Sequence, residues 1–87
     1  MYIILTYDVN VERVNRVRKY LRVYLPHVQN SVFEGEITAA RLTKMKTGLL
    51  KILDLAEDSI LLWILPDTHS MEREVIGIEP RPIGNFL

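Results

Sequence analysis

The sequence has no cysteine and only two histidines, His27 and His69. Disulfide bonds are therefore impossible, and a structural zinc site lacks its usual set of sulfur and nitrogen ligands. Any metal that this chain binds should be a hard cation held by oxygen atoms. Because no secretion signal is recognisable either, the sequence favours a cytoplasmic protein.

Glycine is also scarce, and its four occurrences are isolated from one another: Gly35, Gly48, Gly77 and Gly84. The chain therefore has no glycine-rich loop of the kind that cradles nucleotide phosphates. None of its serines lies in a nucleophile elbow, and the two histidines have no evident acidic partner. Nucleotide binding by a glycine-rich loop and hydrolysis through a covalent serine intermediate are therefore both disfavoured.

Long apolar segments are absent too, since the longest continuous apolar run covers only residues 60–65. This is far too short to cross a bilayer, so we expect no membrane association. The run is typical of a buried strand, stopped by Pro66. We expect Trp63 to lie in the core rather than on a platform that stacks nucleic-acid bases.

What the chain does contain is charge, distributed unevenly. Residues 1–51 carry nine basic and four acidic side chains, whereas residues 52–87 carry two basic and seven acidic ones. The net charge of zero therefore conceals a basic first half that suits an anionic partner. With 87 residues, one domain spanning 1–87 is expected, and such a small core favours an oligomer.

The spacing of apolar residues predicts a strand at 2–7 and then a helix from Val11 to about Tyr24, ended by Pro26. Off the apolar stripe of this helix lies a set of basic residues that we take as candidates for nucleic-acid binding: Arg13, Arg16, Arg18, Lys19 and Arg22. Alternatively, these residues bind no partner and only form the solvent-exposed face of the helix.

Residues 27–37 read as a single extended segment whose alternation breaks at Val32, where a bulge or bend is plausible. Thr38 is a candidate N-cap for a second helix, in which Gly48 would permit close packing.

Strands at 59–65 and 71–78 follow, separated by a loop at 67–70, and residues 83–87 form an apolar tail. This order predicts an α+β domain with two helices on one face of a small antiparallel sheet. The bare face of that sheet favours a two-fold dimer.

Asp8 follows the first strand and precedes the basic helix, and it has two interpretations. It could cap the helix by accepting hydrogen bonds from free backbone amides. It could instead bind Mg²⁺ or Mn²⁺, which needs only one or two protein carboxylates, and a two-fold dimer could present two copies of Asp8 to one ion. On local sequence alone, the cap is favoured.

The chain resembles the CRISPR-associated protein 2 family, the small subunit of the spacer-acquisition complex. The resemblance rests on Tyr7-Asp8 at the end of the first strand, the basic helix, and the segment Gln29-Asn30-Ser31-Val32-Phe33. An amphipathic helix and the apolar strand at 59–65 complete it, so nearly the whole chain is covered.

This resemblance implies a ferredoxin-like sandwich and a homodimer in which the C-terminal segment, about residues 80–87, docks on the partner subunit. It also implies that Asp8 is the catalytic residue and Mg²⁺ ligand of a metal-dependent endonuclease, with Mn²⁺ as an alternative cofactor. Tyr7, Ser31 and Phe33 would shape the site. Where family members often have a basic residue before the glutamine motif, this chain has His27.

Two functions follow from the resemblance. In the first, the chain hydrolyses phosphodiester bonds in RNA or DNA. In the second, it is a non-catalytic adaptor that binds duplex DNA and bridges the CRISPR integrase subunits.

Overall fold

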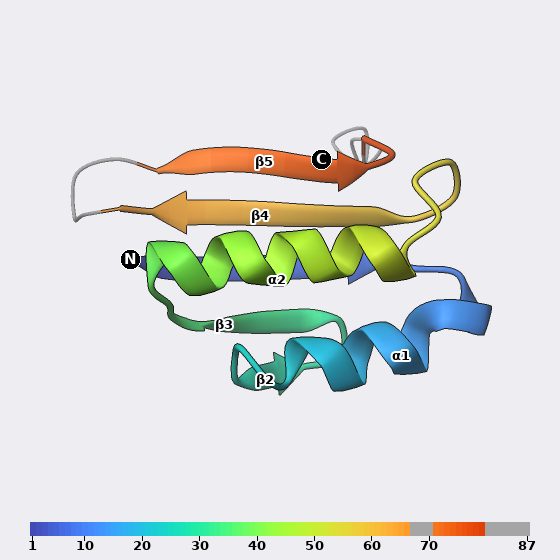
Figure 1. Cartoon of the computed structure of the whole chain (residues 1–87), viewed down its shortest axis with the longest axis horizontal. Helices are drawn as coiled ribbons and strands as arrows, with labels where there is room; N and C mark the ends of the chain where they lie inside the picture. Colours follow the sequence, from blue (N-terminus) through green and yellow to red (C-terminus); the bar gives the residue numbers. More distant parts are fainter. Residues whose placement is uncertain (67–70, 80–87) are drawn as a thin grey trace, which may run out of the picture.

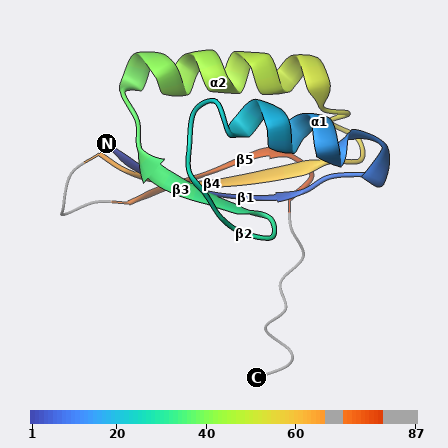
Figure 2. The same ribbon diagram turned by 90° about the horizontal axis from the view of Figure 1, so that it is seen from below.

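The computed structural model describes residues 1–66 and 71–79 and contains one antiparallel sheet and two helices (Figure 1). The elements are β1 (Tyr2–Asp8), α1 (Val11–Leu21), β2 (His27–Gln29), β3 (Val32–Glu36), α2 (Ala39–Ile52), β4 (Ser59–Leu65) and β5 (Glu72–Gly77). The strand order is β2-β3-β1-β4-β5, and both helices cover the same face (Figure 2). This confirms the α+β ferredoxin-like sandwich. The loop expected at 67–70 and the tail at 80–87 lie outside the described residues.

The core lies between the helices and the sheet. Alternate residues of the central strand, Ile3 and Leu5, are fully buried, and their neighbours in β1 are only partly so. The other completely buried apolar side chains come from both helices and from strands β3 and β4: Val17, Leu21, Phe33, Met45, Leu49, Ile60 and Leu62. The buried side chains of the strands, which recur every two residues, thus pack in one layer against those of the helices, which recur about every 3.6 residues. Neither α1 nor α2 is long and apolar enough to span a membrane.

Helix α1 is shorter than predicted at its C-terminal end. The amide of Val23 donates to the carbonyl of Tyr20, and the amide of Tyr24 donates to that of Leu21. These hydrogen bonds join residues i and i−3, whereas α-helical bonds join residues i and i−4. Residues 22–24 therefore form a tighter turn and do not continue the α-helix. At the other end Val11 is exposed, because the buried stripe of α1 comprises only Val17 and Leu21.

The single extended segment predicted between the helices is wrong, because the chain folds there into the hairpin β2–β3. The turn is at residues 30 and 31, where Asn30 has a φ of 36°. Asparagine tolerates this left-handed conformation better than most residues, so a tight turn forms without glycine. The register also shifts between His27 and Gln29, so the irregularity lies in β2, opposite Val32 and Phe33, rather than at Val32 as predicted.

Helix α2 begins and packs as predicted. The Thr38 hydroxyl accepts a hydrogen bond from the amide of Arg41 at 3.2 Å, so Thr38 is the N-cap. Gly48 does permit close packing: a Cβ atom there would lie 1.8 Å from the hydroxyl oxygen of Tyr20. The ring of Tyr20 therefore occupies the space of a side chain at position 48 and ties α1 to α2.

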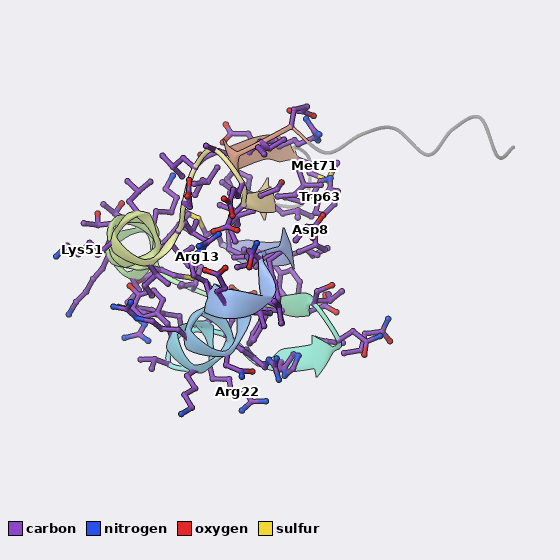
Figure 3. The ribbon with its side chains drawn as sticks, turned by 90° about the vertical axis from the view of Figure 1, so that its right-hand side faces the viewer. Asp8, Arg13, Arg22, Lys51, Trp63 and Met71 are labelled. Carbon is purple, nitrogen blue, oxygen red and sulfur yellow. The ribbon has the colours of Figure 1, made fainter. Side chains whose placement is uncertain are left out.

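Among residues 1–66 and 71–79, no helix or strand covers the face of the sheet opposite the helices, as predicted, and that face carries Trp63. Strand β4 pairs with β1 and β5, which confirms it as an interior strand. Trp63 alternates with the buried Leu62 and Ile64, however, so its ring points away from the helices (Figure 3). The expectation that Trp63 lies in the core is wrong, because a strand that is apolar on both faces gives no sign of which face the helices cover. With Ile4 and Leu61, Trp63 forms a partly exposed apolar surface on the uncovered face.

Candidate functional site

Asp8 is the last residue of β1 and is exposed. In the antiparallel pairing of β1 with β4, Asp8 lies opposite Ser59. Along β1 it alternates with the buried residues Ile3 and Leu5, so its carboxylate belongs to the uncovered face of the sheet. The ion pairs formed within residues 1–66 and 71–79 do not include Asp8. Its carboxylate is therefore accessible to a ligand.

Asp8 does not cap helix α1. The cap is Asn10, whose side-chain oxygen accepts a hydrogen bond from the amide of Glu12 at 3.0 Å. Asp8 lies two residues earlier and still belongs to the strand, with extended backbone pairing. The capping interpretation, which local sequence favoured, is wrong, because the strand continues one residue further than the change of pattern indicated.

Tyr7, Ser31 and Phe33 lie toward the end of the sheet at which β1 ends in Asp8, but Phe33 is buried in the core on the face that the helices cover, opposite the face that carries Asp8. The amide of Tyr7 donates to the carbonyl of Ser31 at 3.2 Å, and the Tyr7 hydroxyl donates to the carbonyl of Asn30 at 3.3 Å. The rings of Tyr7 and Phe33 lie 6.1 Å apart between centroids. These contacts fix the β2–β3 turn against the end of β1. Because the Tyr7 hydroxyl is engaged with the turn, a role in shaping the site fits it better than a role in reaction.

His27 belongs to the same cluster as Phe33 and the β2–β3 turn. Its ring stacks on Phe33 at 4.4 Å between centroids, and its Nε2 lies 2.6 Å from the carbonyl oxygen of Asn30. Its Nδ1 lies 3.3 Å from Nη2 of Arg22. His27 therefore joins the hairpin turn, through Nε2, to Arg22 at the end of α1, through Nδ1.

The basic residues of α1 lie on the helix layer, not on the face that carries Asp8 (Figure 3). Arg16, Lys19 and Arg22 are exposed, and Arg18 is partly buried with its Nη2 donating to Asn15 at 3.0 Å. Within one chain, neither these cations nor the buried ring of Phe33 shares the sheet face that carries Asp8. The sequence alone could not show this, because the face on which Asp8 lies depends on the register of β1.

Arg13 differs from the other α1 cations because the fold already uses its guanidinium. Its Nε donates to Asp58 at 2.7 Å, and its Nη2 donates to Glu57 at 2.9 Å. Its remaining exposure is small, with 19% of the side chain accessible. Arg13 is therefore engaged in holding the start of α1 against the loop before β4, and we leave it out of the proposed binding set.

Asp58 holds the loop beside the candidate site, a role that the sequence did not indicate. It is completely buried, and besides Arg13 it accepts hydrogen bonds from the amides of Asn10 and Asp54, each at 2.9 Å. The bonds to Arg13, opposed by burial, lower the pKa of the Asp58 carboxyl to about 2. It fixes the loop immediately after Asp8. The available signal was an acid directly preceding an apolar strand.

A divalent cation is the cofactor whose chemistry fits Asp8. An exposed carboxylate supplies the oxygen ligand that Mg²⁺ and Mn²⁺ prefer, and Mg²⁺ keeps several of its waters. Within residues 1–66 and 71–79 no group of three or more potential ligands occurs. In that part of the chain, Asp8 therefore belongs to no cage of metal ligands.

Comparison with known proteins places the chain in a family. The family described as CRISPR associated protein Cas2 matches residues 1–73. A protein of Pyrococcus furiosus named CRISPR-associated endoribonuclease Cas2 is 54% identical over 88 residues, which cover all of both chains. A protein of Methanocaldococcus jannaschii with the same name is 46% identical over 87 residues, all of this chain and 76% of that protein.

Solved structures agree with these sequence matches. A crystal structure of a Cas2 protein superposes with a TM-score of 0.74 at 46% identity, covering 95% of this chain and 93% of that chain. The structure of Streptococcus pyogenes Cas2 at pH 6.5 gives a TM-score of 0.68 at 39% identity, covering 75% and 86%. The chain therefore belongs to the CRISPR-associated Cas2 family.

Proposed function

We propose that this protein is a metal-dependent endonuclease subunit of the CRISPR spacer-acquisition machinery, with RNA as its first candidate substrate and DNA as the second. The observation that carries this proposal is the exposed Asp8 carboxylate at the end of β1, in a chain whose relatives are named endoribonucleases. Asp8 would hold Mg²⁺ or Mn²⁺. When bound, such an ion lowers the pKa of a coordinated water and offsets charge on a phosphate.

The proposed active unit is a homodimer closed through the uncovered face of the sheet. That face carries Ile4, Leu61 and Trp63, whose burial would favour association. Asp8 lies on the same face, so a two-fold axis near the ends of the two β1 strands would bring both carboxylates together. Docking of residues 80–87 on the partner subunit stays a prediction, because these residues lie outside the described part of the chain.

Tyr7, Ser31 and Phe33 would position the site without reacting. Their contacts hold the β2–β3 turn beside β1, and the buried Asp58 holds the loop on the other side of Asp8 through the Asn10 amide. A carboxylate flanked by two fixed loops loses less freedom when it binds an ion, which is the advantage of a preorganised ligand.

Metal removal tests the proposed activity. We expect slow cleavage of single-stranded RNA in Mg²⁺, complete loss in excess EDTA, and recovery when Mg²⁺ or Mn²⁺ is restored. The measurement is gel analysis of end-labelled RNA and of duplex DNA. Cleavage that persists unchanged in EDTA would contradict the metal role, and stable RNA and DNA in both metals would contradict nuclease function.

The second candidate function is a non-catalytic adaptor that binds duplex DNA and bridges integrase subunits. The observation that favours it is the basic surface of α1, which lies on the layer opposite Asp8 and can contact DNA without reaching the carboxylate. Arg16, Arg18, Lys19 and Arg22 would bind phosphates with little dependence on base sequence.

Charge reversal tests the adaptor function. We expect Arg16→Glu with Arg18→Glu to weaken duplex-DNA binding by at least about 100-fold at low salt, because repulsion replaces two phosphate contacts. The matched control is Lys46→Glu with Arg73→Glu, which changes the net charge equally on α2 and β5, away from α1, and should retain most of the affinity. Equal loss in both variants, measured by fluorescence anisotropy, would show that α1 is not the binding surface.

A further inference from the structure

A groove of about 520 Å³ lies between α1 and α2, on the layer of the molecule opposite Asp8. One wall carries Arg16, Tyr20 and Tyr24, and the other carries Lys44, Gly48 and Lys51. Figure 3 shows Lys51 on the helix layer, far from the sheet face that holds Asp8. The groove therefore forms a separate site from the candidate active site.

The floor of the groove is fixed by Tyr20. Its hydroxyl lies 3.2 Å from the carbonyl oxygens of both Lys44 and Met45, and it can reach them because position 48 is glycine. Burial, together with the neighbouring Tyr24 hydroxyl, raises the pKa of Tyr20 to about 12, so the phenol stays neutral. Arg41 holds Tyr24 from one side, with its guanidinium carbon 4.7 Å from the ring centroid. The two aromatic side chains thus form a preformed apolar surface.

The rim of the groove carries three cations and no acid. Arg16, Lys44 and Lys51 are exposed, and the ion pairs among the described residues leave all three out. Lys46, on the same helix but outside the groove, is by contrast paired with Glu74 at 3.0 Å. Lys44 and Lys51 are seven residues apart on α2, so their Cα atoms lie on one face about 10 Å apart along the helix. Arg16 faces them from α1.

We propose that this groove binds a nucleotide through its phosphate, with the phosphate at the cationic rim and the base or sugar against the tyrosine floor. Its volume lies in the range of small-molecule sites. A phosphate dianion suits three unpaired cations, and aromatic side chains bind bases of any sequence. The nucleotide is either free or one unit of a single strand. Nucleotide binding in this groove does not depend on cleavage at Asp8, so an experiment can reject one of these two proposals and leave the other intact.

Calorimetric titration with adenosine 5′-monophosphate tests this site. The wild-type protein should bind it with a dissociation constant below about 1 mM at low salt. Lys44→Gln with Lys51→Gln should weaken binding at least about tenfold, because two charge-assisted contacts are lost. The control, Lys46→Gln with Arg73→Gln, removes the same charge outside the groove and should change the affinity less than about twofold. Thermal melting of each variant checks that it is folded.

Two further titrations sharpen the outcome. Adenosine, which lacks the phosphate, should bind far more weakly than the monophosphate, and the Gly48 amide resonance should shift on addition of the monophosphate. A single-stranded tetranucleotide that binds more tightly, with the same loss in the Lys44 and Lys51 variant, identifies a strand as the ligand; equal affinity identifies the free nucleotide. The proposal would be overturned if neither the monophosphate nor the tetranucleotide binds, if the Lys46 and Arg73 control weakens binding as much as the Lys44 and Lys51 variant, or if the Gly48 amide resonance does not shift.

Discussion

Replacing Asp8 with asparagine should abolish metal-dependent cleavage while leaving the fold intact. The Asp8→Asn side chain keeps the size of the original but loses the charge that would hold Mg²⁺, so we expect the cleavage rate to fall at least about 100-fold. Stability should change by less than about 0.5 kcal/mol, because Asp8 is exposed and Asn10, not Asp8, caps α1. Single-turnover cleavage and urea unfolding measure the two effects.

The matched control for this variant is Glu36→Gln. Glu36 is also an exposed acid, but it pairs with Tyr2 at the opposite end of β1. Its replacement should leave cleavage within about twofold of wild type, because its charge is remote from the site. If Asp8→Asn cleaves at the wild-type rate, Asp8 is not the metal ligand of a nuclease. If only cleavage is lost and DNA binding remains, the adaptor surface on α1 is independent of the carboxylate.

Replacing Asp58 with asparagine should cause the largest loss of stability. Asp58 is completely buried and receives four hydrogen bonds, two from Arg13 and one each from the amides of Asn10 and Asp54. An asparagine turns one acceptor oxygen into a donor that faces other donors, and it leaves Arg13 without its buried partner. Breaking such a pair costs about 3–5 kcal/mol. Urea unfolding at pH 7 should show this decrease.

The same carboxylate predicts how stability depends on pH. Its folded pKa of about 2 lies below its ordinary value of 3.8, so the folded state favours the charged form. The stabilisation is complete above about pH 4 and is lost as the pH falls through the folded pKa of about 2. The free energy of unfolding of the wild type should fall between pH 4 and 2 more steeply than that of Asp58→Asn, because the variant has no titrating side chain at position 58.

Glu57→Gln provides the comparison for Asp58→Asn. Glu57 also pairs with Arg13, at 2.9 Å, but its side chain is 52% exposed. Exposed pairs contribute at most about 1 kcal/mol, so this variant should remain close to wild type. If Asp58→Asn is equally mild, the buried network does not hold the loop beside Asp8, and the positioning role assigned to Asp58 is wrong.

The sequence predicts most of the architecture because its local signals agree with one another. Thr38 precedes a clear apolar stripe, so both the start and the buried face of α2 were predictable. The β2–β3 hairpin was not, because its turn uses Asn30 in a left-handed conformation and contains no glycine. Trp63 was misplaced for a different reason: a strand that is apolar on both faces does not indicate which face the helices cover.

The candidate site was predictable only in part. Asp8 stands out as a carboxylate at the end of an apolar strand, whereas Tyr7, Ser31 and Phe33 contact the β2–β3 hairpin and the core, and their role in shaping a site stays a prediction. The face on which Asp8 lies depends on pairing with β3 and β4, which are distant in sequence. The engagement of Arg13 by Asp58 likewise joins residues 45 positions apart, and no local pattern reports it.

The proposed unit of function is a pair of Asp8 carboxylates that share one ion, and counting bound Mn²⁺ tests it most directly. Electron paramagnetic resonance titration of the purified protein, with its oligomeric state measured in the same sample, gives the number of ions per chain. We expect one tightly bound Mn²⁺ for every two chains, and none for Asp8→Asn. Equal Mn²⁺ binding by wild type and Asp8→Asn would contradict it.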